Sequence, residues 1–293
     1  MILSKRRTGK KNPRSRPIGI CSVFILIIVL LGASSDAVPS PPVSFANHYL
    51  EVLPDGFDPW SAPVAGIEGE TAVMVRRTSY HENLLLDIYY PSGVIPEVPA
   101  AAVVFVSGNS DITIRKEQGR PWMRGNQAMG WCRLAAENGL IALSYESGSS
   151  TADSLETLGC WLKDNARVYG IDTESTGLWS CSNGCGMTVA ALREGYEAFG
   201  GIRPQFGVFL YGDLVPKSDQ DLSIPVLAVR AAKDVQADGT LIERFVQRLN
   251  EKGGRAILLE HTTGDHAFDV RRDTAETRKV IRVILEFMVN PEI

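Results

Sequence analysis

The regular alternation of strand-like and helix-like segments is the feature that most constrains this fold. Short apolar runs predict strands, and longer stretches with apolar residues at helical spacing predict helices. The strands are expected at residues 71–78, 84–90, 100–106, 140–145, 177–179, 206–211, 224–231 and 256–260. The helices are expected at residues 130–138, 151–169, 187–198, 241–249 and 274–289. Alternation over about 220 residues predicts a mainly parallel sheet with helices on both faces.

The first two predicted strands are expected to pair differently from the others. Only a short turn at residues 81–83 separates them, which favours an antiparallel hairpin. The run at residues 100–106 is continuously apolar, as expected for a strand buried on both faces. The sequence therefore predicts an α/β fold with a mainly parallel sheet and an antiparallel N-terminal edge.

The N-terminal segment has the pattern of a secretory signal peptide. Cations precede an apolar run at residues 18–31, and small or polar residues follow at 32–37. The cations are Lys5, Arg6, Arg7, Lys10, Lys11, Arg14 and Arg16. The apolar run of about 14 residues is short for a membrane span, which needs roughly 20. We therefore expect cleavage near Ala37 and export, either secreted or periplasmic. An uncleaved signal anchor is the alternative. We expect contact with a membrane only through this N-terminal segment, and only if it stays uncleaved.

Three regions follow from this pattern. Residues 1–37 are the signal peptide or anchor, 38–69 form a proline-rich tether, and 70–293 form the folded domain. The tether is assigned because its prolines disfavour regular helix. These prolines are Pro39, Pro41, Pro42, Pro54, Pro59 and Pro63.

Charge and motif content exclude several classes of function. The net charge of -4 provides no basis for nucleic-acid binding. No metal-ligand spacing is present, and no dinucleotide-binding glycine pattern follows a strand. We expect no nucleic-acid partner, no metal and no cofactor.

The stretch at residues 176–186 carries the most specific catalytic signal. Ser182 lies between a short apolar strand and a helix, with Ser180 and Gly184 two positions away on either side. A strand that turns sharply into a helix holds the central hydroxyl above the sheet and directs helix N–H groups to the same place. The usual pattern is G-x-S-x-G, and Ser180 replaces its first glycine.

A serine nucleophile needs a base and an acid that orients the base. His266 lies in a loop beyond the last predicted strand, at the edge that also holds Ser182. It is a better candidate than His261, which ends that strand. Asp234 directly follows strand 224–231, and Asp213 is the runner-up. The chain order is then serine, acid, histidine, as expected of this turn.

Residues 71–289 resemble an α/β-hydrolase, and residues 224–269 are similar to the dienelactone-hydrolase-like branch. The similarity lies in residues 230–234, in the helix around Phe245, and in the Gly264–Phe268 run. The resemblance implies Ser182 as nucleophile, Asp234 as acid and His266 as base. It also implies an oxyanion hole formed by the N–H of Asn183 and by an N–H near Gly108 or Asn109. The chain departs from the family at Ser180, and residues 107–109 stand where many members carry His-Gly.

These assignments predict a serine hydrolase that cleaves a carboxylic ester, lactone or thioester through an acyl-enzyme. The expected partner is a small ester-like molecule. Two alternatives stay open. The altered turn is also compatible with a non-catalytic binding or scaffold protein of the same fold. A thiol-dependent hydrolase is the other, because Cys181 and Cys185 flank the serine, although both are expected to be structural.

Two further features yield expectations. The long loop at residues 111–129 carries four cations with Trp122 and Met123, and it is either a solvated rim or a contact for an acidic or aromatic substrate. The cations are Arg115, Lys116, Arg120 and Arg124. Four cysteines follow the signal segment, and Cys132 and Cys160 are expected on helices that cover opposite faces of the sheet. We therefore expect buried thiols and no disulfide between these two.

Overall fold

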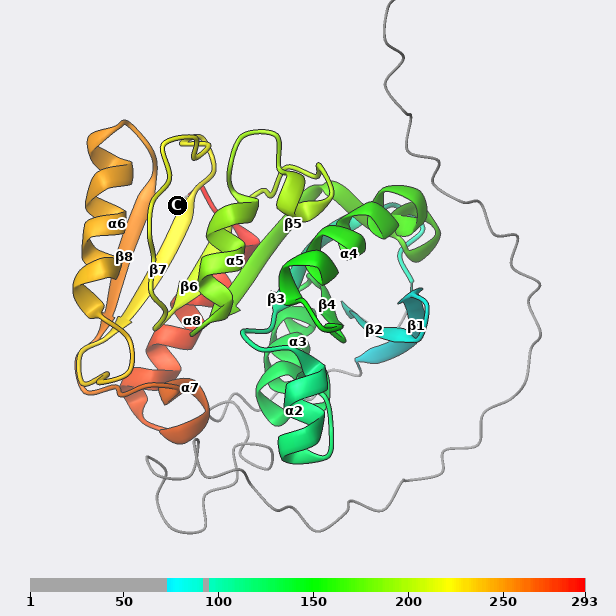
Figure 1. Ribbon diagram of the computed structural model, residues 1–293, viewed down its shortest axis with the longest axis horizontal. Coiled ribbons are helices and arrows are strands. Elements are labelled where there is room, and N and C mark those ends of the chain that lie inside the picture. Colours follow the sequence, from blue (N-terminus) through cyan, green and yellow to red (C-terminus); the bar gives the residue numbers. More distant parts are fainter. Residues whose placement is uncertain (1–72, 92–94, 293) are drawn as a thin grey trace, which may run out of the picture. The chain divides into compact units, whose positions relative to one another are not determined.

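The computed structural model describes residues 73–91 and 95–292 (Figure 1). The predicted signal peptide and tether lie outside the described residues. Eight strands form one sheet in the order β1-β2-β4-β3-β5-β6-β7-β8. The strands are β1 (Met74–His81), β2 (Leu84–Tyr90), β3 (Ala100–Val106), β4 (Ile141–Tyr145), β5 (Ile171–Cys181), β6 (Gly207–Leu210), β7 (Val226–Ala231) and β8 (Ala256–His261).

The pairing of the strands confirms the predicted fold class. β1 pairs antiparallel with β2, and β2 pairs antiparallel with β4. From β4 to β8, all neighbouring strands are parallel. Two parallel strands must be joined by a crossover that passes over one face of the sheet. The helices in these crossovers therefore cover the faces of the sheet.

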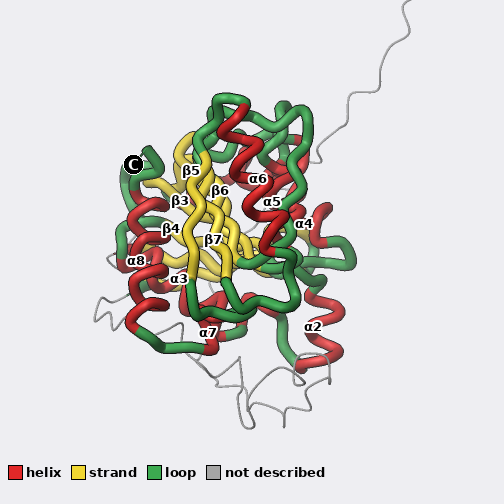
Figure 2. The backbone as a smooth tube through the Cα atoms, turned by 90° about the vertical axis from the view of Figure 1, so that its left-hand side faces the viewer, coloured by secondary structure: helices red, strands yellow, loops and turns green. Residues whose placement is uncertain are grey.

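Helices cover both faces of the sheet, as Figure 2 shows from the side. The helices are α2 (Asp111–Gln118), α3 (Asn126–Glu137), α4 (Thr151–Asn165), α5 (Gly184–Ala191), α6 (Gly239–Glu251), α7 (Phe268–Arg271) and α8 (Ala275–Val289). Three short 3-10 helices accompany them in the described part: η2 (Trp122–Arg124), η3 (Ala166–Tyr169) and η4 (Glu197–Phe199). One hydrophobic cluster joins α3 and α8 to the sheet, while α4 and then α5 with α6 pack in separate clusters on the opposite side.

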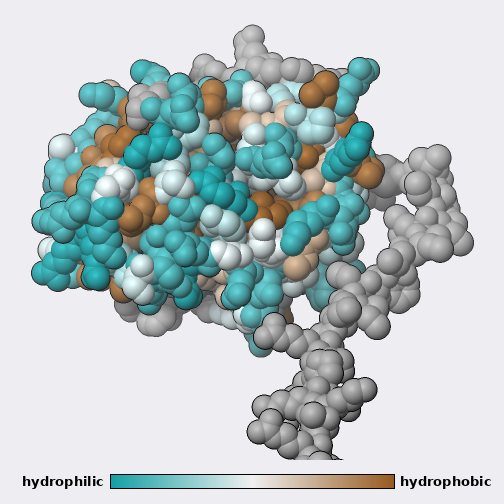
Figure 3. Space-filling view, turned by 90° about the horizontal axis from the view of Figure 1, so that it is seen from above, coloured by the Kyte–Doolittle hydropathy of each residue, from teal (hydrophilic) through white to brown (hydrophobic). Residues whose placement is uncertain are grey.

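The described structure leaves α2 and α7 beyond the carboxyl edge of the parallel strands (Figure 1). α2 follows β3, and α7 follows β8. The opposite end of the domain, seen from above in Figure 3, mixes hydrophilic side chains with smaller hydrophobic areas. The loops that carry the candidate site therefore gather at one end of the sheet, as expected for this class of fold.

The helix after Ser182 differs from its prediction at residues 187–198. α5 begins at Gly184 and ends at Ala191. It begins earlier because the chain enters the helix directly from the turn at Ser182. It cannot continue to residue 198, because Gly195 and Tyr196 adopt positive φ values of 88° and 51°, which a right-handed α-helix does not accommodate.

Two helices at the carboxyl edge were not predicted. α2 lies within the segment predicted as a loop at residues 111–129, and α7 contains four residues. α2 has no apolar stripe at helical spacing that the sequence could reveal, because Ile114 is its only buried apolar residue among those described. Gly170, with a φ of 66°, ends η3, the short turn that continues α4, so the predicted helix end at residue 169 is confirmed.

The cysteines partly match their expected burial. Cys132, Cys181 and Cys185 are buried free thiols, whereas Cys160 is exposed, contrary to the prediction. Cys160 lies on the solvent side of α4, because Leu155, Leu158 and Leu162 take the positions that face the sheet. Cys132 and Cys160 are on α3 and α4, which cover different faces. Within residues 73–91 and 95–292, no helix combines the length and apolar character needed to cross a membrane.

Candidate active site

Ser182 occupies a strained turn between β5 and α5. Its φ is 50°, a left-handed conformation that is uncommon for a residue other than glycine. The Ser182 N–H donates to the carbonyl oxygen of Leu210 at 2.9 Å, and the Ser182 carbonyl accepts from the Cys185 N–H at 3.1 Å. These bonds hold the backbone in a conformation that exposes the hydroxyl at the sheet edge, and such strain is typical of a functional turn.

The turn requires a glycine at position 184, because a side chain there would collide with the backbone of β3. A Cβ atom on Gly184 would lie 2.9 Å from the carbonyl oxygen of Val106, at the end of β3. A Cβ atom on Gly108 would lie 2.9 Å from the Gly184 nitrogen. The loop after β3 therefore runs directly against the start of α5, and only glycines permit this approach. Ser180, which replaces the first glycine of the pattern, is fully buried within β5.

His266 connects Ser182 with Asp234. Its Nε2 atom lies 2.9 Å from the Ser182 Oγ, and its Nδ1 atom lies 2.8 Å from the Asp234 Oδ2. Ser182 follows β5, Asp234 follows β7 and His266 lies in the loop after β8. The carboxyl edge of the sheet therefore brings the three residues together, as the sequence predicted. Both side chains are largely buried: 10% of the His266 side chain and 4% of the Asp234 side chain are exposed. The catalytic role of each residue stays a prediction.

The Asp234 carboxylate is held in its ionised form. Burial alone would raise its pKa, but hydrogen bonds outweigh this effect and hold the pKa of Asp234 below its ordinary value. His266 provides one bond, and the N–H groups of Gln236 and Ala237 donate to Oδ1 at 2.8 and 3.1 Å. An ionised carboxylate fixes the imidazole tautomer with hydrogen on Nδ1, which leaves Nε2 free to accept a proton from Ser182.

Asp213 and His261, the less favoured candidates for the acid and the base, make other contacts. Asp213 accepts a hydrogen bond from the Asp238 N–H at 3.0 Å. His261 is fully buried, and its Nε2 lies 2.8 Å from the Thr277 hydroxyl of α8. Burial lowers the pKa of His261, which favours a neutral structural histidine.

The three candidate oxyanion-hole residues lie beside the nucleophile. Asn183 follows Ser182 directly and precedes α5, and its Nδ2 lies 3.5 Å from the Asn109 Oδ1. A Cβ atom on Gly108 would be 3.3 Å from the Asn183 nitrogen. The Asn109 N–H is 3.3 Å from the Ser107 hydroxyl. The structure thus brings the loop after β3 to the start of α5, and the donation of these N–H groups to an oxyanion stays a prediction.

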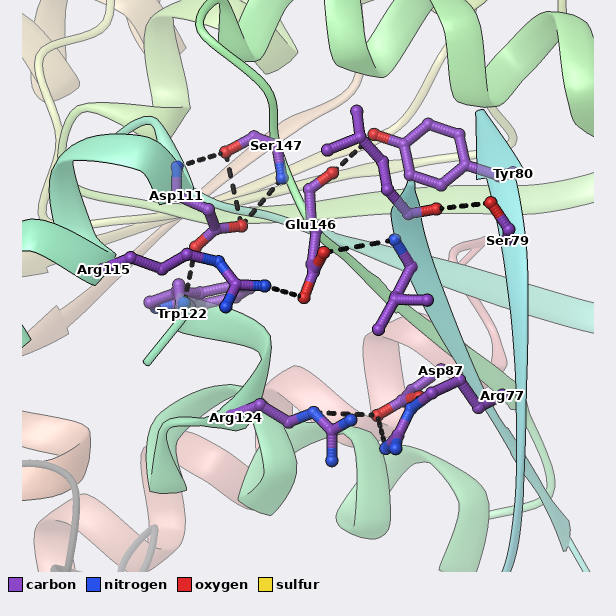
Figure 4. Close-up of polar contacts among 12 residues, drawn as sticks. Arg77, Ser79, Tyr80, Asp87, Asp111, Arg115, Trp122, Arg124, Glu146 and Ser147 are labelled. Carbon is purple, nitrogen blue, oxygen red and sulfur yellow. Dashed lines mark hydrogen bonds and ion pairs between the residues drawn. The ribbon is translucent and has the colours of Figure 1, made fainter. Parts of the chain in front are cut away.

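The basic segment at residues 111–129 is mostly helical, because it contains α2, η2 and the start of α3. Figure 4 shows the polar contacts that Arg115 and Arg124 of this segment make. Arg115 of α2 forms an ion pair with Glu146, and the Arg124 Nε lies 3.7 Å from Asp87. Trp122 and Met123 are buried. Two of the four cations therefore bind carboxylates of the chain itself, which disfavours a role for them in binding an acidic substrate.

Asp111, which the sequence interpretation missed, joins this segment to β4. Its Oδ1 accepts from the Trp122 N–H at 2.5 Å, and its Oδ2 accepts from the Ser147 N–H at 2.7 Å (Figure 4). The Ser147 hydroxyl donates to the Asn109 carbonyl at 3.2 Å. Asp111 thereby supports the loop after β3. Asp111 is the first residue of the predicted loop, and the local sequence gave no signal of its contacts because Trp122 and Ser147 are 11 and 36 positions away.

The two thiols near Ser182 are poor candidates for the nucleophile. Cys185 is fully buried, and burial raises its pKa to about 12. Burial also raises the pKa of Cys181 well above its ordinary value. A thiol needs a lowered pKa to attack as a thiolate. Among the described residues, no three His, Cys, Asp or Glu side chains are grouped to hold a metal ion.

Comparison with known proteins identifies the fold. The chain matches no protein-family model and no curated protein. It is similar to the apo form of esterase 2 from Thermogutta terrifontis, with a TM-score of 0.60 and 16% identity over 74% of this chain and 95% of that one. The fold is an α/β-hydrolase fold.

Two further structures of the Thermogutta esterase show the same likeness. The butyrate-bound form has a TM-score of 0.57 at 16% identity, and the form phosphorylated by paraoxon has a TM-score of 0.58 at 16% identity. Both comparisons cover 74% of this chain and 94% of that one. Since the α/β-hydrolase fold hosts many activities, the function has to be argued from the site.

Proposed function

We propose that this protein is a serine hydrolase that cleaves an ester-like bond through an acyl-enzyme. One observation carries the proposal: His266 contacts the Ser182 hydroxyl at 2.9 Å and the Asp234 carboxylate at 2.8 Å. A nucleophile, a base and an orienting acid in this chain of contacts have the geometry that acyl transfer requires.

The proposed reaction follows from these contacts. The Ser182 Oγ attacks the substrate carbonyl carbon while the His266 Nε2 takes its proton. The N–H of Asn183, with an N–H at Gly108 or Asn109, stabilises the oxyanion that forms. His266 then donates the proton to the leaving oxygen or sulfur, which departs and leaves an acyl-Ser182. Water, activated by the same imidazole, attacks this ester and releases the acid and the free serine.

We propose a small acyl ester, lactone or thioester as the substrate. The Thermogutta esterase of similar fold was seen with butyrate and with propionate bound, which supports starting from short acyl groups. The sequence resemblance of residues 224–269 to the dienelactone-hydrolase-like branch supports including lactones. We also propose that the protein works after export, on the basis of residues 1–37, with an uncleaved membrane anchor as the alternative.

The direct test combines a labelling experiment with turnover. The purified protein is expected to react with a fluorophosphonate probe and to hydrolyse p-nitrophenyl butyrate, and Ser182→Ala is expected to lose both. Ser144→Ala is the control, because it makes the same serine-to-alanine change at a fully buried position in β4. Iodoacetamide is expected to change neither result.

A non-catalytic binding or scaffold protein is the competing hypothesis, and the altered turn at Ser180 motivates it. This hypothesis predicts no covalent labelling and no turnover over a panel of acyl esters, lactones and thioesters. Labelling that persists in Ser182→Ala would also contradict the proposed nucleophile.

A further inference from the structure

Tyr211 has an unusual backbone at the carboxyl end of β6. It is almost completely buried, and its φ of 40° places it in the left-handed region. This conformation is a genuine outlier for a bulky aromatic residue, and such outliers persist where the surroundings hold them. The next residue, Gly212, lies so close to Ser182 that a Cβ atom there would be 2.3 Å from the Ser182 carbonyl oxygen. The strained turn therefore passes directly against the proposed nucleophile.

The ring of Tyr211 packs against the imidazole of His266. Their centroids are 4.9 Å apart, and the planes meet at 62° in an edge-on arrangement. This is the preferred geometry for aromatic pairs. The hydrogen bond to Asp234 holds one edge of the imidazole, but rotation about that contact would still move Nε2 away from the Ser182 Oγ. The Tyr211 ring restricts this rotation from a second direction.

A buried carboxylate holds Tyr211 in place. The Tyr211 hydroxyl donates to the Asp269 Oδ1 at 2.7 Å, and Asp269 is fully buried. The Asp269 Oδ2 accepts from the Trp131 Nε1 at 2.8 Å and from the Gln127 Nε2 at 3.0 Å. The same Gln127 amide donates to the Tyr211 hydroxyl at 2.8 Å. The carboxylate thus has three donors, so the network is well satisfied despite its burial.

The network joins three elements of the site. Asp269 is three residues after His266, on α7; Gln127 and Trp131 belong to α3; and Tyr211 follows β6. The Gln127 Oε1 also accepts a weak contact from the Cys181 thiol at 3.8 Å, next to Ser182. α7 is only one turn long, and Phe268 and Val270 pack in the hydrophobic cluster that contains α3. Asp269 adds hydrogen bonds that tie the His266 loop to Gln127 and Trp131 of α3.

We propose that Tyr211 and Asp269 are positioning residues that hold the His266 imidazole toward Ser182. This inference rests on the proposed hydrolase function. Neither residue exchanges a proton with substrate. Tyr211 fixes the plane of the imidazole, and Asp269 fixes Tyr211 while it ties the His266 loop to α3.

Tyr211→Phe is the decisive variant because it keeps the ring and removes only the hydroxyl. We expect kcat for p-nitrophenyl butyrate to fall by about 10-fold to about 100-fold, in line with the effect of small misplacements in an active site. KM should stay close to its wild-type value, because the hydroxyl faces Asp269 rather than the substrate. Asp269→Asn replaces one accepting carboxylate oxygen of the same network with an amide NH2 group, and it should lower kcat in the same way.

Tyr90→Phe is the matched control. Tyr90 is fully buried, and its hydroxyl donates to the Tyr169 carbonyl at 3.1 Å in the cluster that contains α4. This variant loses one buried tyrosine hydrogen bond, as Tyr211→Phe does, but on the other face of the sheet. We expect a comparable loss of stability and an unchanged kcat. A Tyr211→Phe protein with wild-type kcat, or with a change in KM alone, would overturn the proposal.

Proton NMR provides a readout that does not depend on turnover. The proton shared by the His266 Nδ1 and Asp234 should give a far-downfield resonance, assigned by its absence in Asp234→Asn. Tyr211→Phe should broaden or shift this resonance, and Tyr90→Phe should leave it unchanged. An unchanged resonance in Tyr211→Phe refutes the positioning role even if the wild-type protein hydrolyses no ester. Absence of turnover and labelling in the wild-type protein would instead count against the proposed function.

Discussion

Asp234 differs from the other carboxylates near this edge of the sheet because it contacts the His266 imidazole directly. Asp234→Asn should keep the fold but present an amide to Nδ1, which favours the wrong imidazole tautomer. We expect kcat to fall by about three to four orders of magnitude. Steady-state kinetics with p-nitrophenyl butyrate, together with a thermal unfolding curve, measures both properties.

Asp213→Asn is the control for that variant, since the Asp213 carboxylate accepts from the Asp238 N–H. Its kcat should be close to that of the wild type. A severe loss in Asp213→Asn, combined with a mild one in Asp234→Asn, would show that the acid is misassigned.

The proposed role of His266 as base leads to a prediction of how turnover depends on pH. An imidazole can take the Ser182 proton only when it is neutral, so kcat/KM should rise as the pH is raised from acidic values. His266→Ala should remove both the rise and nearly all turnover. His261→Ala should keep the pH dependence, because His261 contacts Thr277 of α8 rather than Ser182. Substantial activity in His266→Ala would exclude it as the base.

At the scale of elements, α2 begins with one buried carboxyl group, that of Asp111. Burial raises the pKa of Asp111 to about 6, and the N–H groups of Trp122 and Ser147 oppose this effect without cancelling it. The folded protein then binds the proton more tightly than the unfolded chain does. The contribution of Asp111 to stability is fully present below about pH 4, and it is lost as the pH rises to about 6.

The loss of stability with rising pH can be measured by removing the Asp111 carboxyl group. Asp111→Asn removes the titrating group, so its unfolding free energy should fall less than that of the wild type between pH 4 and pH 7. The difference between the ordinary pKa and about 6 corresponds to roughly 3 kcal/mol. Urea unfolding at several pH values measures the effect, and the exposed Asp153→Asn serves as the control. Equal slopes for Asp111→Asn and the wild type would refute the prediction.

At the scale of the whole molecule, the N-terminal pattern predicts a shorter mature protein. Seven cations before an apolar run should direct export, and cleavage near Ala37 should follow. N-terminal sequencing and intact-mass measurement of the protein exported by its native host give the cleavage site. An intact Met1 in the membrane fraction would demonstrate the uncleaved anchor instead.

The sequence alone determined the fold class and most of the sheet. Strands such as β3 and β4 are short apolar runs, and burial on both faces produces that pattern locally. It also led to Ser182, Asp234 and His266, because each follows a predicted strand and parallel strands end at one edge. The fold class is confirmed and the three residues lie in contact, because both depend only on local periodicity and the order of elements along the chain. The catalytic roles of the three residues stay predictions.

Only the tertiary structure decided the contacts around that edge. The Tyr211 hydroxyl reaches Asp269 across 58 positions of sequence, and Trp131 reaches the same carboxylate across 138. α2 was missed because it lacks an apolar stripe, and its polar contacts through Asp111 and Arg115 reach partners distant in sequence. Residues so far apart carry no local signal of their pairing, since the packing of the sheet and helices creates the contact. The physical reason is that side-chain positions depend on the folded backbone, whereas strand and helix patterns depend on near neighbours.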